Sequence, residues 1–457
     1  MEWSYQLLTA EQQTLFDRLS VFSGGCDRRA AEAVCADDII GEADVAELLS
    51  DLVDKSMVVA DRHPDGTRYR VLETLRQFGE DQLRNHGDTG RLRDCHLRYY
   101  LDVMEDAEDL FRGPRQVVAV ATFNSEWDNL RRAHESAILT GDLRTAERLL
   151  WASRLYAWRW LRSEHGDWAE QTIALESPSR SPTPDTFAQV AYWAYVADDT
   201  DRCDDLVARG IDHAASMDDP GIALCLLASV TSEDPRITDY TTQLEVVVSK
   251  IDLDREWWIL IELANIAHLH DPTSEQAHIH RVLEAADRIR TPTLIAAALT
   301  FRGHRAIDED PPNFAVARDC YQRALDVAHH TGDLLAEGDS LRAVAMATVG
   351  LDPGNAIEAC REALICLYEG RFWHRIWQLC ESVALALAST AQPEAAAVVL
   401  GHLHAHRPPF GFEYRLGYRA RTVQIVGSHP EAEVWMARGA AMDRHQVVQY
   451  ALTAIAL

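Results

Sequence analysis

The sequence predicts a mainly α-helical protein: an N-terminal winged-helix domain with a small β-hairpin, followed by an α-solenoid of degenerate helix pairs. Two observations predict this fold. Residues 1–90 have the order helix, helix, helix, two short strands around a turn, helix. Beyond residue 90 nearly every segment has amphipathic helical spacing, and small residues recur every 33 to 39 positions. We expect a winged helix over 1–90, a helical connector with the first helix pairs over 91–176, and the solenoid over 185–457.

The elements of the first domain are predicted from capping and turn signals. Thr9 and Gln12 form a capping box, so a first helix should run from there to about Val21. Asp27 caps a second helix that reaches Val34. The third helix carries an apolar stripe made of Val45, Leu48, Leu49, Leu52 and Val53. Strands are expected over 57–60 and 67–72, joined by the turn His63-Pro64-Asp65-Gly66, and a fourth helix begins near Thr74.

The negative charge of this domain is unfavourable for DNA binding. A winged helix that reads DNA places its third helix in the major groove, with Arg, Lys, Asn or Gln on the outer face. Here that face carries Asp44, Glu47, Asp51 and Asp54. Residues 1–90 contain 18 acidic and 9 basic side chains, and the whole chain has a net charge of -28. Phosphate backbones repel such a surface, so direct nucleic-acid binding is unexpected.

The chain also lacks the signature of a phosphate-binding loop. Such a loop needs Gly-Lys-Ser/Thr after a glycine-rich turn. The lysines are Lys55, which follows Asp54, and Lys250, which follows Ser249. We therefore expect no nucleotide cofactor, and no other cofactor, in this chain.

Four ordered segments resemble one bacterial regulator family: WSYQLLTAEQQTLFDRLSVFSGGCDRRAAEAVC, DVAELLSDLVDKSMVVAD, RYRVLETLRQFGEDQL and SEWDNLRRAHESAILTGD. They look like the winged helix and the following sensor of STAND-type ATPase transcriptional regulators, often called LuxR-family or adenylate-cyclase-like regulators in actinobacteria. The resemblance is strongest over residues 1–150. It implies a sensor of tetratricopeptide type and a separate or upstream ATPase or cyclase-like module as partner.

The resemblance also suggests a coupling site near the end of the winged helix. Many STAND proteins carry a nucleotide-sensing Met-His-Asp motif there, and the counterpart here is Val71-Leu72-Glu73. With leucine at the histidine position, direct contact with a nucleotide is not expected. Glu73 and Arg76 remain candidates for interdomain coupling, against the alternative that Arg76 simply pairs with Glu73 or Glu80 on the helix surface.

The remainder of the chain is expected to be helical. One helix should cover 96–110, and Ser125 with Asp128 should cap the next, which Gly141 ends. Residues 177–184 (SPSRSPTP) have the composition of a linker. After it come the recurring small residues Ala214, Val247, Ala286, Ala324, Ala363 and Ala397. Segments such as FAVARDCYQRALDVAHHTGD resemble tetratricopeptide repeats, whose stacked helix pairs form a curved solenoid with a binding surface on its concave face.

Aromatic residues form three clusters in the solenoid, and two interpretations of them stay open. The clusters are Tyr192/Trp193/Tyr195, Trp257/Trp258 and Phe372/Trp373/Trp377. They either pack between the helices of the repeats or anchor a partner on the concave face, since Trp and Tyr dominate binding hot spots. The candidate partner-binding residues are Trp193, Trp258, Trp373 and Trp377.

We found no catalytic constellation and no metal-binding pattern. His402, His404 and His406 lack further ligands at suitable spacing. An enzyme is therefore not expected, and the absence of a leader or a long apolar run predicts a cytoplasmic protein. The leading hypothesis is a non-catalytic region of a regulator, whose solenoid binds a protein, peptide or small-molecule effector and whose winged helix passes that event to an ATPase or effector module. The alternative is a stand-alone winged-helix regulator that binds DNA.

Overall fold

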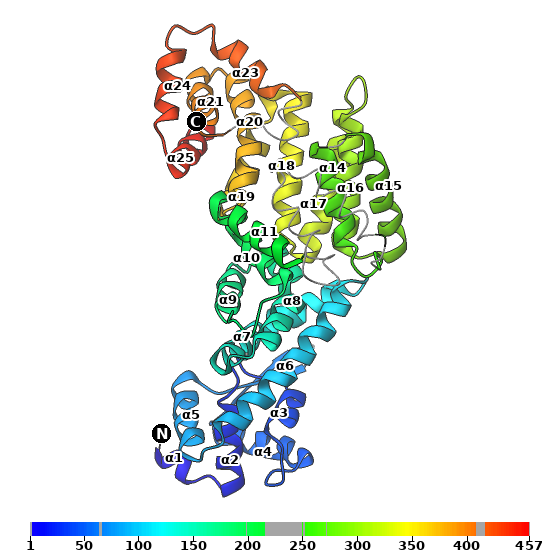
Figure 1. Ribbon diagram of the computed structural model, residues 1–457. Coiled ribbons are helices and arrows are strands. Elements are labelled where there is room, and N and C mark those ends of the chain that lie inside the picture. Colours follow the sequence, from blue (N-terminus) through cyan, green and yellow to red (C-terminus); the bar gives the residue numbers. More distant parts are fainter. Residues whose placement is uncertain are drawn as a thin grey trace. The chain divides into compact units, whose positions relative to one another are not determined.

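The computed structural model describes residues 2–63, 66–197, 199–214, 249, 252–270, 272–407 and 416–456. The chain divides into two compact units (Figure 1). The first comprises Met1–Phe111, Arg115–Tyr156 and Asp167–Pro182, and the second comprises Arg112–Pro114, Ala157–Gly166 and Thr183–Leu457. The predicted domain limits of 1–90, 91–176 and 185–457 stay predictions.

The first unit contains the winged helix and most of the helical segment that follows it. Its elements, of which α8 and α9 also reach into the second unit, are α1 (Glu2–Gln6), α2 (Ala10–Leu19), α3 (Arg28–Cys35), α4 (Glu42–Asp54), β1 (Val59–His63), β2 (Gly66–Arg70), α5 (Glu73–Asn85), α6 (Thr89–Phe111), α7 (Gln116–Thr140), α8 (Leu143–Arg159) and α9 (Glu164–Ile173).

Local signals in the sequence explain how the winged helix forms. The Thr9 hydroxyl accepts a hydrogen bond from the Gln12 N–H, and the Gln12 side chain accepts one from the Thr9 N–H, so the predicted capping box is confirmed at the start of α2. Asp27 caps α3 as expected. The predicted stripe of α4 faces the core, with Val45, Leu49 and Leu52 fully buried. The fold class, mainly helical with a winged helix, a two-stranded antiparallel hairpin and a solenoid-like array, is confirmed.

Two predictions about local boundaries were wrong. The first strand begins at Val59 rather than at residue 57, because the N–H groups of Met57 and Val58 bond to the carbonyl of Leu52 and finish the end of α4. The second strand ends at residue 70 rather than 72. Of the predicted turn that joins the strands, Pro64 and Asp65 lie outside the described residues.

The predicted cap at Ser125 is also wrong, because α7 runs without a break from Gln116 to Thr140. The Ser125 hydroxyl donates instead to the carbonyl of Thr122, one turn earlier in the same helix. The predicted end at Gly141 is confirmed: this glycine adopts the left-handed conformation that closes α7.

In the second unit, each helix from α14 to α20 packs on the helix that follows it, whereas the last three helices, α23 to α25, pack back on α19, α20 and α21. Its elements are α10 (Pro184–Val196), α11 (Thr200–Ala214), α14 (Trp258–His270), α15 (Pro272–Ile289), α16 (Pro292–Ile307), α17 (Phe314–Thr331), α18 (Leu334–Leu351), η1 (Pro353–Asn355), α19 (Ile357–Glu369), α20 (Trp373–Ser389), α21 (Pro393–His406), α23 (Tyr418–Val426), α24 (Ala432–Ala440) and α25 (Arg444–Ile455).

The recurring small residues mark alternate helices of this series. Ala286, Ala324, Ala363 and Ala397 lie in α15, α17, α19 and α21, and all four are buried. A spacing of 34 to 39 residues therefore corresponds to one helix pair. Val247 lies outside the described residues.

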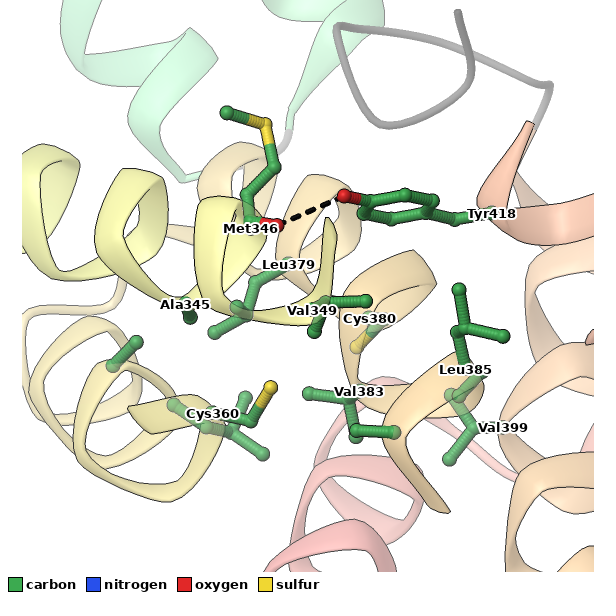
Figure 2. Close-up of a cluster of buried hydrophobic side chains, with 14 of the residues drawn as sticks. Ala345, Met346, Val349, Cys360, Leu379, Cys380, Val383, Leu385, Val399 and Tyr418 are labelled. Atoms are coloured by element: carbon green, nitrogen blue, oxygen red, sulfur yellow. Dashed lines mark hydrogen bonds between the residues drawn. The ribbon is translucent and has the colours of Figure 1, made fainter. Parts of the chain in front are cut away.

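Aliphatic, small and sulfur-containing side chains fill the core between α18, α19, α20 and α21. Figure 2 shows Val349, Cys360, Leu379, Val383 and Val399 meeting there, and each is essentially inaccessible to solvent. The Tyr418 hydroxyl donates to the carbonyl of Met346 at 2.9 Å, so α23 is joined to α18 by a buried polar contact as well as by packing. This core holds the helices that carry the candidate site.

Candidate ligand-binding pocket

A cavity of about 230 Å³ lies within the second unit. The residues that line it belong to the even-numbered helices α10, α14, α16, α18 and α20, and Arg159 at the end of α8 also lines it. The odd-numbered helices carry the buried alanines described above. Stacked helix pairs place one helix of each pair on the same side, so residues distant in the sequence meet in one cavity.

Charged side chains of both signs line the cavity. The Arg375 Nε atom in α20 lies 2.7 Å from the Asp339 Oδ1 atom in α18. Glu262 in α14 lines it too and accepts a long contact of 3.5 Å from the Asn265 amide. Arg159 donates from Nε to the Asp333 carboxylate at 2.5 Å, and Asp333 itself is buried as the N-cap of α18.

The surroundings shift the titration of three lining residues. Burial opposes the charged form of Arg375, but the negative charges of Asp339 and Glu262 outweigh it and raise the pKa of this guanidinium. Burial raises the pKa of Glu262, against the opposing effect of its Asn265 contact and of Arg375. Burial and the nearby Arg375 hold the pKa of His374 well below its ordinary value. The cavity thus holds a guanidinium whose charged form is favoured and a carboxyl group whose charged form is disfavoured by burial.

An aromatic wall completes the cavity. Tyr192 and Tyr195 come from α10, and Phe372 and Trp373 come from the start of α20. The Tyr195 ring lies 5.1 Å from the His374 ring, centroid to centroid. The cavity therefore offers both apolar ring surfaces and charged groups, which is the composition of small-molecule sites.

The four tryptophans singled out from the sequence lie in different surroundings. Trp258, Trp373 and Trp377 are 4%, 3% and 7% exposed, so in this conformation they pack between helices. Only Trp373 of these three lines the cavity. Trp193 is half-buried, and its Nε1–H group donates to His165 Nδ1 at 3.2 Å. The assignment of these residues to partner binding stays a prediction.

Glu73 and Arg76 form a local ionic network in the first unit. Arg76 donates to both oxygens of Glu73, at 2.8 and 2.9 Å, and to Glu80 at 2.8 Å. Glu80 also pairs with Arg132 in α7. These contacts match the surface-pairing alternative for Arg76, and they connect α5 of the winged helix to α7.

A second set of contacts fixes the hairpin, and the loop between α2 and α3, to α7. Arg68 in β2 pairs with Glu126 at 2.5 Å and donates to the carbonyl of Ser125 at 2.9 Å. Asn129, which is fully buried, accepts from the Ser23 N–H and donates to the Gly25 carbonyl, each at 2.9 Å. A basic residue of the wing is therefore occupied by protein contacts instead of facing outward.

The outer face of α4 is acidic, as predicted. Asp44, Glu47 and Asp54 are exposed, and Asp51 accepts a hydrogen bond from Gln12 at 2.7 Å. The C-terminal histidines make backbone contacts: His402 lies 3.2 Å from the carbonyl of Met442, and His406 lies 2.7 Å from that of Ala440. Within the described part of the chain, no group of three or more His, Cys, Asp or Glu side chains is placed to hold a metal ion.

Residues 8–84 match the family described as the winged helix-turn-helix domain. A Mycobacterium tuberculosis protein named "Putative HTH-type transcriptional regulator" is 34% identical over 205 residues, which cover 42% of this chain and 23% of the relative. A Mycobacterium bovis protein of the same description matches equally. This chain thus matches less than a quarter of the length of these relatives.

One solved structure has a similar fold. The Signal Transduction ATPase with Numerous Domains (STAND) protein with a tetratricopeptide repeat sensor from Pyrococcus horikoshii superposes with a TM-score of 0.52 at 15% identity, over 96% of this chain and 63% of that protein. Among the helices of the described residues, none is both long and apolar enough to cross a membrane.

Sequence reasoning identified part of the aromatic wall but missed the charged lining. Tyr192, Tyr195 and Phe372 belong to the aromatic clusters, whereas Glu262, Asp339 and Arg375 were not singled out. A signal for Glu262 was present: with Asn265, it interrupts the apolar run WWILIELANIAHL at positions one helical turn apart. Such a polar pair on an otherwise apolar helix indicates a polar interior site.

Proposed function

We propose that this chain is the signal-sensing region of a transcriptional regulator of STAND type, with the cavity of the second unit as its effector site. The winged helix would pass the binding event to an ATPase or effector module. The cavity, which combines both charge signs with an aromatic wall, carries this proposal. The winged-helix match, the regulator names of the mycobacterial relatives and the sensor of the Pyrococcus protein support a regulatory role.

The first unit is suited to mechanical coupling. The Arg68–Glu126 and Arg76–Glu80–Arg132 contacts tie β2 and α5 to α7, so the winged helix and its connector would move as one body. In a two-state regulator, an effector that favours one state shifts the population of the whole molecule. We place this function in the cytoplasm, and it requires no chemical step in this chain. Hydrolysis of ATP by the purified chain would contradict that part of the proposal.

Filling the cavity tests the proposal without knowledge of the effector. Ala297 lines the cavity in α16, so Ala297→Trp would occupy it, whereas Arg305→Trp puts the same ring on the exposed side of the same helix. In the cell of origin, we expect Ala297→Trp to change the set of transcribed genes and Arg305→Trp to leave it as in the wild type. Identical transcription in all three strains would refute the effector site.

The alternative, a stand-alone DNA-binding regulator, is favoured by the winged helix-turn-helix match over residues 8–84. The exposed acids of α4 and the engaged Arg68 oppose it. Fluorescence anisotropy of the full chain with labelled genomic DNA fragments separates the two. We expect no saturable binding at physiological salt, and tight, salt-dependent binding would favour the alternative.

A further inference from the structure

The charges around the cavity balance, although the chain as a whole is strongly acidic. Arg159, Arg342 and Arg375 supply three positive charges on the lining. Glu262 and Asp339 on the lining, with Asp333 beneath Arg159, supply three negative ones. In a chain of net charge -28, this local balance sets the cavity apart. A ligand that fits it electrostatically carries no large net charge of its own.

The arginines and the carboxylates that line the cavity can each make further hydrogen bonds. Arg159 and Arg375 contact their carboxylates through Nε, and no described residue makes a hydrogen bond to their terminal Nη atoms. Asp339 Oδ1 is buried and lacks a hydrogen bond of good geometry, although it lies 2.7 Å from Arg375 Nε. Glu262 receives only the 3.5 Å contact from Asn265. Unused forked donors favour a carboxylate, and poorly satisfied carboxylates favour an ammonium group.

We propose that the cavity binds a small zwitterion of the amino-acid type: its carboxylate on Arg159 and Arg375, its ammonium group on Glu262 and Asp339, and an apolar side chain against Tyr192, Tyr195 and Trp373. The inference rests on the proposed function, because it names the ligand class of the same effector site. A simple anion would leave unused the remaining acceptor capacity of the two carboxylates, and a simple cation would leave the terminal nitrogens of the guanidinium groups unused. Burial raises the pKa of Glu262, and a bound ammonium group would act in the opposite direction by favouring the charged form of this carboxyl.

Isothermal titration calorimetry of the complete chain with three matched compounds tests the class. L-Phenylalanine carries both charges, 3-phenylpropanoate lacks the ammonium group, and 2-phenylethylamine lacks the carboxylate. Because either analogue lacks one set of charge-assisted hydrogen bonds to the cavity, we expect L-phenylalanine to bind at least about tenfold more tightly than either of them. Equal affinity for 3-phenylpropanoate, or no binding of L-phenylalanine at millimolar concentration, would overturn the proposal.

Two substitutions locate the charges. Arg375→Gln should lower the affinity for L-phenylalanine and for 3-phenylpropanoate by roughly tenfold and leave the affinity for 2-phenylethylamine unchanged. Glu262→Gln should lower the affinity for the two ammonium compounds and leave that for 3-phenylpropanoate unchanged. Arg361→Gln, which removes an exposed arginine of α19 paired with Glu358, is the matched control and should alter none. Thermal melts establish that each variant folds. If one variant does not fold, the titration of the wild-type chain with the three compounds still tests the proposal.

The outcomes separate this inference from the proposed function. Binding of only 3-phenylpropanoate or only 2-phenylethylamine would rule out a zwitterionic ligand and leave the proposed effector site intact. The same affinities in Arg375→Gln, Glu262→Gln and wild type would place the ligand elsewhere and overturn the inference. The transcriptional effect of Ala297→Trp decides the proposed function independently, because it requires no ligand.

Discussion

Replacing Asn129 by alanine should detach the turn between α2 and α3 from α7 and destabilise the first unit. The Asn129 side chain is fully buried and makes four hydrogen bonds, of which the longest joins its Oδ1 atom to His96 Nε2 at 3.4 Å. It accepts from the Ser23 N–H at 2.9 Å, and it donates to the Gly25 carbonyl at 2.9 Å and to the Glu126 carboxylate at 2.8 Å. Alanine removes all of them, and the buried Gly25 carbonyl keeps only the hydrogen bond from Arg68, at 3.0 Å.

The magnitude follows from the number of bonds and from burial. Each hydrogen bond contributes about 1 kcal/mol net, and a buried group left unsatisfied costs about 1 to 3 kcal/mol. We therefore expect Asn129→Ala to lower the free energy of unfolding of the first unit by about 3 kcal/mol. Asn85→Ala, an exposed position at the end of α5, is the matched control and should change it by less than about 0.5 kcal/mol.

Chemical unfolding followed by circular dichroism and tryptophan fluorescence measures these differences. Because the chain has two units, their transitions are assigned by variants confined to one unit or the other. Equal stability of the Asn129→Ala variant and the wild type would show that the buried network does not hold the turn on α7. The proposal that the winged helix and its connector move as one body would then rest on the ion pairs of Arg68 and Arg76 alone.

Three further variants test the packing and the titration of the two units. Trp258→Ala should cost about 3 to 5 kcal/mol because this ring is 4% exposed, whereas Trp3→Ala, 74% exposed, should cost almost nothing; equal melting temperatures would contradict the buried placement. Gly439→Ala should destabilise the second unit by about 1 to 3 kcal/mol or more, because a Cβ atom there would overlap the Val398 carbonyl. Gly90→Ala is the control and should not destabilise the protein, because the space around Gly90 is open. A stable Gly439→Ala variant would refute the close approach of α24 to α21. Burial lowers the pKa of His96 to about 4, so its contribution to stability is complete above pH 6.5 and is lost as pH falls through 4. Over that window, the free energy of unfolding of the wild type should fall by about 3 kcal/mol relative to that of His96→Gln. Parallel pH profiles of the two proteins would contradict this.

The parts of the fold that were predicted correctly depend on local signals. The Thr9–Gln12 capping box, the Asp27 cap and the left-handed Gly141 each fix a helix end through contacts a few residues apart. The errors arose where a longer-range effect won. Ser125 has the chemistry of a helix cap, but the apolar residues before it continue α7 because they are buried against other helices.

The candidate site depends on contacts that no local pattern contains. Arg159 and Asp333 are far apart in the sequence, and they meet only because the helices stack. Glu262, Asp339 and Arg375 lie on three different helices, and each alone resembles an ordinary polar residue on a helix surface. The aromatic clusters indicated the region, but Trp258, Trp373 and Trp377 are all buried, and only the packing of the helices places Trp373 on the cavity and the other two away from it.

Hydrogen–deuterium exchange of the Ala297→Trp chain, compared with wild type and with Arg305→Trp, tests most directly whether the cavity communicates with the winged helix. If occupation of the cavity shifts the molecule between two states, exchange should change in α5 and α7 of the first unit as well as around α16. The Arg305→Trp chain should show wild-type exchange in α5 and α7. A change confined to the helices that line the cavity, with α5 and α7 exchanging as in the wild type, would contradict a coupled sensor.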